Sequence, residues 1–161
     1  MKRYKWMVII LNLLALLIYF GYAIVAKEAL LKDGQLVLLE LAPLDPRSLI
    51  QGDYMTLRYK ISENADAKDI PKRGYCVIHL DSNGIASKAR FQQHKSPLSR
   101  HEHLIEYTRP DRWNINIGAE SFFFEEGQAE KYGKAKYGGV KVDKNGNSLL
   151  MALYDEKLQK I

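Results

Sequence analysis

The chain has 161 residues, a length that suits one globular domain rather than two. Its formal net charge is +5, and three of the cations, Lys2, Arg3 and Lys5, precede a long apolar run, which leaves +2 for everything after it. So small a charge, with no clustered basic face, argues against nucleic acid as a partner.

The apolar run extends from residue 6 to residue 26. It contains no charged side chain, and Asn12 is its only strongly polar residue. About 20 apolar residues, rising 1.5 Å each in a helix, span the roughly 30 Å of a bilayer core. The run is also longer than the apolar region of cleaved signal peptides, about 7–15 residues. We therefore predict a retained signal-anchor helix over 6–26. The alternatives are a signal peptide cleaved at the small-x-small site Gly21-Tyr22-Ala23 and a buried helix of a soluble protein.

The flanking charges set the expected orientation. The cations before the run have no counterpart after it, because the charges of residues 27–33 cancel. The positive-inside tendency then places residues 1–5 in the cytoplasm and the rest of the chain in a periplasm-like compartment outside the inner membrane. Residues 27–34 are expected to extend the helix until Gly34 stops it, and residues 35–161 to form the periplasmic domain. Asn12 is expected to lie at an interface with another helix, because polar side chains in lipid seek partners.

Short strand signals separated by turns fill the remainder. In chain order they cover residues 35–41, 54–61, 74–80, 85–91, 103–108, 112–118, 121–127, 138–143 and 148–155. Alternation is clearest at 54–61, where Met55, Leu57, Tyr59 and Ile61 point to one side. In 85–91 the odd-numbered residues are expected to share one side. This pattern of about eight short strands predicts an all-β domain, either a small antiparallel barrel or a sandwich.

The connections are also recognisable. The turns at 81–84 and 144–147 each contain Asn-Gly, which favours tight hairpins. The polar stretches 62–74 and 92–103 are expected to be loops, and 127–139 a mobile segment with room for one helical turn. Cys76 is the only cysteine and lies in an apolar strand pattern, so it is expected to be a buried hydrophobic residue rather than half of a disulfide.

The segment from Leu44 to Ile61 is expected to begin with a turn and to end as a strand. Asp45 is suited to accept backbone N–H bonds, and Pro46 suits the first position of a helical turn. Gly52 permits backbone shapes that other residues resist, and Asp53 is suited to accept N–H bonds from the preceding loop. Each of these residues therefore has a structural role, and none needs a catalytic role to account for it.

The spacing Gly52-Asp53-Tyr54-x-x-Leu57-x-Tyr59 resembles the motif that names the GDYXXLXY family of bacterial membrane-anchored proteins. The preceding 45–49 and the later 122–127 look like that family too, so the resemblance covers nearly the whole chain. It implies one N-terminal span, a small β-rich domain and no assigned activity. Members are often encoded beside multi-pass membrane proteins, which implies such a protein as the partner. The candidate binding rim is then Asp45, Pro46, Arg47, Gly52, Asp53, Tyr54, Leu57, Tyr59, Phe124, Glu126 and Gly127.

A fainter similarity, to signal peptidases of the Ser/Lys type, sets up an enzymatic alternative. Those enzymes enter their β-fold through a Ser-Met-x-Pro-Thr-Leu-x-x-Gly-Asp segment. Aligned on Gly52 and Asp53, the position of their nucleophile falls on Leu44, which has no nucleophilic atom. Ser48 is the nearest replacement, and it needs a neutral lysine as its base. The spacing selects no such lysine from Lys72, Lys88 and Lys95.

Other groups of polar residues favour structural readings. His101 and His103 alternate as strand ligands do, but a zinc site needs three or four ligands, and His94, Glu106 or Asp111 join only if the fold brings them close. Glu125 and Glu126 are neighbours on a strand and so face opposite ways. Glu120 alternates with Phe122 and is expected to need a cation such as Arg47 or Arg58. Phe123 lies opposite Phe122 and Phe124, so at least one of these rings is expected to stay exposed.

The sequence thus favours a non-enzymatic accessory or assembly subunit of a membrane complex, without a cofactor or a metal. Two alternatives stay open, the signal-peptidase-like hydrolase and a periplasmic ligand or peptide sensor. The oligomeric state does not follow from the sequence.

Overall fold

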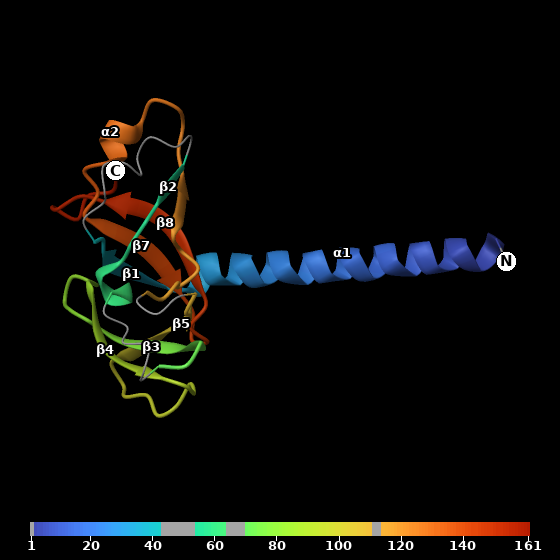
Figure 1. Cartoon of the computed structure of the whole chain (residues 1–161), viewed down its shortest axis with the longest axis horizontal. Helices are drawn as coiled ribbons and strands as arrows, with labels where there is room; N and C mark the ends of the chain where they lie inside the picture. Colours follow the sequence, from blue (N-terminus) through green and yellow to red (C-terminus); the bar gives the residue numbers. More distant parts are fainter. Residues whose placement is uncertain (1, 43–53, 64–69, 111–113) are drawn as a thin grey trace.

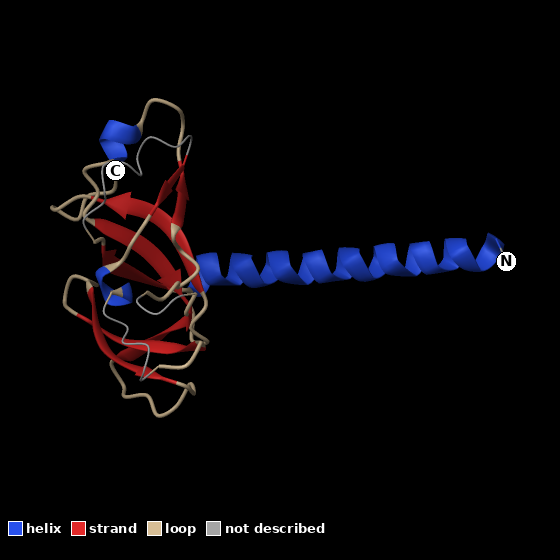
Figure 2. Ribbon diagram, viewed as in Figure 1, coloured by secondary structure: helices blue, strands red, loops and turns tan. Residues whose placement is uncertain are grey.

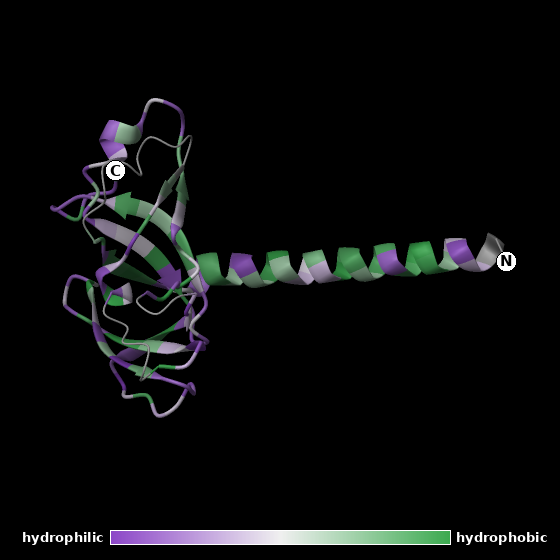
Figure 3. Ribbon diagram, in the orientation of Figure 1, coloured by the Kyte–Doolittle hydropathy of each residue, from purple (hydrophilic) through white to green (hydrophobic). Residues whose placement is uncertain are grey.

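The computed structural model of the chain describes residues 2–42, 54–63, 70–110 and 114–161. One long helix, α1 (Lys2–Asp33), projects from a β-rich domain (Figure 1). Its segment Tyr4–Asp33 is long and apolar enough to cross a membrane, and the most apolar part of that segment is entirely exposed. Apolar residues run along most of its length (Figure 3). The helix therefore suits a membrane span or signal anchor, and it is not the buried helix of a soluble core.

The helix is joined directly to the domain. It ends at Asp33, and strand β1 (Gln35–Glu40) begins after the single residue Gly34. The Lys141 ammonium donates a 2.6 Å hydrogen bond to the Gly34 carbonyl, and the Leu30 side chain is buried. The end of α1 is thus held by a polar and an apolar contact, which fixes the helix relative to the first strand.

The domain has about the predicted number of strands, and of the two predicted architectures, barrel or sandwich, the barrel is not observed in the described part of the chain. Its other elements are β2 (Tyr54–Thr56), η2 (Lys60–Ser62), β3 (Arg73–Leu80), β4 (Ala86–Gln92), β5 (Glu102–Thr108), β6 (Ser121–Phe123), α2 (Ala129–Tyr132), β7 (Tyr137–Val142) and β8 (Ser148–Tyr154). The eight strands form three antiparallel sheets, β1-β7-β8, β2-β6 and β4-β3-β5 (Figure 2). None of these sheets closes on itself, so the described residues form no barrel.

The sheets share one hydrophobic core, to which each contributes buried side chains. Strand β1 links two of them, because Leu38 forms a parallel bridge with Ile85, in the turn between β3 and β4. Leu41, just beyond β1, forms a bridge with Tyr59. Cys76 is fully buried in this core, and burial raises the pKa of its thiol to about 12, so it is a neutral apolar group as predicted.

Three predicted strands are shorter than expected or absent, and one of these, 121–127, ends at Phe123. The alternation over 54–61 is confirmed, since Met55, Leu57, Tyr59 and Ile61 are all buried, but the strand stops at Thr56 and the chain turns into η2. Segment 114–118 keeps its alternating burial without becoming a strand, and only Asn116 forms a bridge. A side chain here takes the place of a strand-to-strand backbone hydrogen bond: the Ser148 hydroxyl donates to the Ile117 carbonyl.

The prediction that residues 85, 87, 89 and 91 share one side was wrong. Ala86 is the buried residue at the start of β4, whereas Ser87 and Ala89 are exposed. The register with β3 shifts between Val77 and Ile78: Val77 pairs with Arg90, and Ile78 pairs with Lys88. Ala89 therefore has no partner on β3. Such a bulge inserts one extra residue and reverses the alternation beyond it.

Both predicted hairpin turns are present, and a third turn near the C-terminus has the same design. Asp81, Asp143 and Asp155 each accept N–H bonds from the residues two and four positions later. The fourth residue of each turn has a positive φ, and it is glycine in the two predicted turns, Gly84 and Gly146. An aspartate with this geometry fixes the turn and hence the register of the strands it joins.

Glu102, at the start of β5, holds the loop before it against β4. Its carboxylate is almost fully buried, accepts two hydrogen bonds from the Arg90 guanidinium and accepts a third, at 2.8 Å, from the Ser99 N–H. These bonds hold the pKa of Glu102 at about 2, below the ordinary value of 4.5. Glu102, which lies between His101 and His103, is therefore a structural anchor.

This pKa predicts a particular sensitivity to acid. Because the folded-state pKa is lowered, the stabilising effect of the pair is complete above about pH 4.5 and is lost as the pH falls toward 2. We expect the melting temperature of the full chain in detergent to fall over that range. Glu102→Gln should melt lower at pH 7 and depend less on pH. Glu106→Gln, at an exposed position of the same strand, is the control and should behave like the native chain.

Candidate functional site

The two segments that carry the family-like motifs lie side by side. Strand β2 pairs with β6 in an antiparallel register that matches Tyr54 with Phe123, Met55 with Phe122 and Thr56 with Ser121. Beyond β2 the Leu57 N–H donates to the Glu120 carbonyl, so residues 56–62 continue beside residues 114–120. The structure therefore brings the described part of the motif, residues 54–59, and the Phe-rich segment into one substructure.

Tyr59, the last residue of the motif, sits in the centre of this substructure. Its side chain is fully buried, and its hydroxyl donates to the Ala119 carbonyl. A methyl group on Gly138 of β7 would lie 2.9 Å from the Tyr59 ring, so the ring packs directly on that backbone. Burial, together with the negative charge of Glu120, raises the pKa of Tyr59 far above its ordinary value and keeps it a neutral donor.

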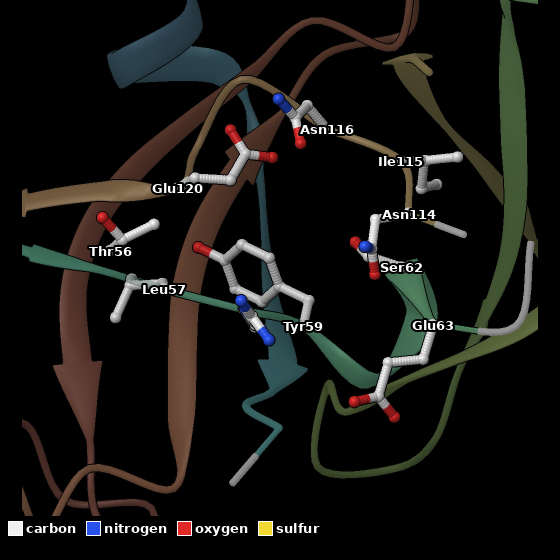
Figure 4. Close-up of a pocket in the computed structure, with 10 residues that line it drawn as sticks. Thr56, Leu57, Tyr59, Ser62, Glu63, Asn114, Ile115, Asn116 and Glu120 are labelled. Carbon is white, nitrogen blue, oxygen red and sulfur yellow. The ribbon is translucent and has the colours of Figure 1, made fainter. Parts of the chain in front are cut away.

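A polar pocket of about 250 Å³ opens beside Tyr59 (Figure 4). One wall comes from the motif strand and η2, and the other from the segment before β6. Its lining residues are Thr56, Leu57, Arg58, Tyr59, Ser62, Glu63, Asn114, Ile115, Asn116 and Glu120. Hydroxyl, amide, carboxylate and guanidinium groups therefore surround a volume near the small end of the range for ligand sites.

Two side chains give the pocket its character. The Ser62 hydroxyl is buried and has no hydrogen-bond partner among the described residues, a costly arrangement that a bound polar atom would relieve. The Glu120 carboxylate accepts a bond from the Ile117 N–H and lies beside the Tyr59 ring (Figure 4). The predicted arginine partner for Glu120 is not observed: Arg58 lines the same pocket but forms no ion pair with it, and Arg47 lies outside the described residues.

The predicted rim residues separate into three groups. Asp45, Pro46, Arg47, Gly52 and Asp53 lie outside the described residues, as does Ser48 of the hydrolase alternative, and only the backbone of Tyr54 is described. Leu57 and Tyr59 are core residues that border the pocket from within. The three others follow the end of β6: Phe124 is half-buried, and Glu126 and Gly127 are exposed.

The aromatic residues of β6 divide as the alternation predicts. Phe122 and Phe124 stack with centroids 6.4 Å apart, and Tyr132 of α2 packs against both, at 4.9 and 5.3 Å. Phe123 points the other way and is 72% exposed. An exposed ring of this size on a sheet with only two strands is a ready contact for lipid headgroups or for another protein.

The remaining candidates stay separate from this pocket. Asn12 lies on α1 and is exposed, like its neighbours along the helix. The described residues contain no cluster of three or more potential metal ligands. Ser62, Asn114 and Asn116 are pocket residues that the sequence did not single out. Alternation over 112–118 places both asparagines outward, but nothing in the sequence marks Ser62.

Comparison with known proteins agrees with the motif. The model of the family described as "GDYXXLXY protein" matches residues 16–153, which includes most of the apolar helix and nearly all of the domain. No curated protein and no solved structure matches the chain, and the similarity to signal peptidases therefore receives no support. With a match over this much of its length, the chain belongs to the GDYXXLXY family.

Proposed function

We propose that this protein is a non-enzymatic accessory or assembly subunit of a membrane complex. Its N-terminus lies in the cytoplasm, α1 spans the inner membrane and the β-rich domain lies in the periplasm. The observation that supports this most is α1 itself, an apolar helix that is exposed over a membrane-spanning length and is joined to a folded domain by one residue.

The charges and the anchoring of the helix support this arrangement. Lys2, Arg3 and Lys5 precede the span, which favours a cytoplasmic N-terminus. Because Leu30 is buried and Lys141 holds the Gly34 carbonyl, the span and the domain move as one body. Such a body presents two surfaces in a fixed relation, as a subunit that contacts a partner both in lipid and in the periplasm requires.

The test is affinity purification of the tagged full chain in a mild detergent. We expect a multi-pass membrane protein to be recovered in fixed stoichiometry. The matched control replaces residues 6–26 with an unrelated single-pass helix of the same length and orientation, which should reduce recovery. Purification of the native chain as a clean monomer would contradict the proposal. A periplasm-dependent reporter fused after Ile161 tests the orientation, and activity only of a cytosolic reporter would overturn it.

The pocket beside Tyr59 favours a second candidate, a periplasmic sensor of a small polar ligand. Its buried Ser62 hydroxyl and its mixture of charges suit a molecule that carries both donors and acceptors. We expect a fraction of a periplasmic extract to raise the melting temperature of the full chain, and Ser62→Ala to remove that shift without lowering the temperature measured in buffer. The absence of a shift with every fraction would count against this role.

A further inference from the structure

Most of the small or oxygen-bearing residues in the apolar part of α1 lie along one side of the helix. Seven residues of the charge-free segment 6–26 are small or carry a side-chain oxygen: Asn12, Ala15, Tyr19, Gly21, Tyr22, Ala23 and Ala26. Five of these seven, all but Gly21 and Ala23, follow the spacing 12-15-19-22-26. At 3.6 residues per turn they lie within a stripe about 80° wide, where a random arrangement would place about two of them.

The spacing of the stripe is that of a helix-packing seam. Steps of three and four in alternation give a period of 3.5 residues, which keeps one side of a helix against a neighbour that crosses at about 20°. Small side chains such as Ala15 and Ala26 permit close approach of two helices in lipid. Asn12 brings an amide into the membrane, where a hydrogen bond from a neighbouring helix satisfies it.

The stripe continues into a cavity outside the membrane. The next positions of the same pattern are Ala29 and Asp33, and both are exposed. Together with Ala26 they line a cavity of about 690 Å³ between the end of α1 and the domain. Its opposite wall is mixed: Leu98, Leu104 and Val142 are apolar, and polar side chains surround them, namely Gln35, Glu102, His103, Asp143, Lys144 and Asn145. One continuous surface therefore runs from Asn12 in the span to the wall formed by the loop before β5.

A second copy of this chain fits that surface poorly. Only Gly34 separates α1 from β1, so a second copy would bring its own domain to the level of the cavity. The contacts of Leu30 and Lys141 prevent that domain from swinging away. A transmembrane helix that leaves the membrane without an attached domain at this level meets no such obstruction.

We propose that the stripe and the cavity form one docking surface for a transmembrane helix of a different protein. The helix packs along Asn12, Ala15, Tyr19, Tyr22 and Ala26 with a polar side chain opposite Asn12. Its first turns outside the membrane enter the cavity, against Leu98. The inference rests on the proposed function and specifies the surface that the partner uses.

The test is site-specific photo-crosslinking of the full chain in native membranes. Benzoylphenylalanine is placed singly at Ala15, Tyr19, Tyr22 and Ala26 on the stripe, at Leu98 in the cavity wall, and at Leu13, Leu17, Phe20 and Ile24 on the opposite side at matched depths. We expect one product, identified by mass spectrometry as this chain joined to a transmembrane segment of another protein. Its yield should be at least about fivefold higher from the stripe and from Leu98 than from the opposite side.

Each other outcome has a definite meaning. Equal yields from both sides of α1 would overturn the docking surface, and a product with the mass of two copies would replace the partner helix by a second chain. Recovery of a multi-pass partner that crosslinks only to the domain would overturn the inference but leave the proposed function intact. Absence of any partner, by purification and by crosslinking, would overturn both. As a second measure, Ala15→Leu with Ala26→Leu should lower partner recovery about tenfold, whereas Leu13→Ala with Ile24→Ala should leave it unchanged.

Discussion

Replacing Tyr59 with alanine is expected to lower the free energy of unfolding of the β-rich domain by about 3–5 kcal/mol, as for other large buried aromatic residues. The ring is fully buried, packs on Gly138 of β7 and bridges to Leu41 beyond β1. Its removal opens a cavity where the β1-β7-β8 sheet meets the motif segment. Domains of this size are stable by about 5–15 kcal/mol in total, so the variant should be marginal. Unfolding of the full chain in detergent by urea, followed by near-ultraviolet circular dichroism, measures the change.

Two further substitutions separate packing from hydrogen bonding. Tyr59→Phe keeps the ring but leaves the buried Ala119 carbonyl without its donor, a loss of about 1–3 kcal/mol. Phe123→Ala removes an aromatic ring that is 72% exposed and is expected to cost less than about 1 kcal/mol. If Tyr59→Ala were as stable as Phe123→Ala, the motif tyrosine would not be the structural centre described above.

The prediction for Tyr59 shows how far the sequence alone reaches. The alternation over 54–61 identifies Tyr59 as a core residue, because a period of two requires only local sequence. The hairpin turns at Gly84 and Gly146 are equally local, since aspartate and glycine form them without help from the rest of the chain. Composition likewise identifies α1, because length and apolarity decide whether a helix suits a membrane.

Features that depend on contacts between distant segments were missed. The strand from Tyr54 ends at Thr56 because Tyr59 pairs instead with Leu41 and with the Ala119 carbonyl, which only the folded chain brings near. The bulge at Ala89 depends on the register between β3 and β4. The polar pocket has the same origin. Ser62 lines it only because η2 turns toward the segment that carries Asn114 and Asn116, so no local pattern reveals the site.

Inserting four Gly/Ser residues after Gly34 is expected to weaken recovery of the partner about tenfold or more while leaving the domain as stable as before. The insertion separates Gly34 from β1, so the chain no longer holds the Gly34 carbonyl beside Lys141 or Leu30 against the domain. With a rigid connection, binding of the helix also orients the domain, so the second contact forms without a further loss of orientational entropy. With a flexible linker, the domain loses that entropy separately when it binds, and binding is weaker. The insertion also removes one wall of the cavity beside Ala29 and Asp33.

The matched control places the same four residues after the exposed Lys134, between α2 and β7, which does not line the cavity. This variant has the same added length and should recover the partner as the native chain does. Full recovery from the Gly34 variant would mean that the helix and the domain act independently, as a simple tether and a separate periplasmic module. Loss of recovery from the Gly34 variant, with unchanged urea unfolding, would mean that the fixed angle between α1 and β1 is itself part of what the partner recognises. The single residue between these two elements would then be a determinant of binding as well as a connection.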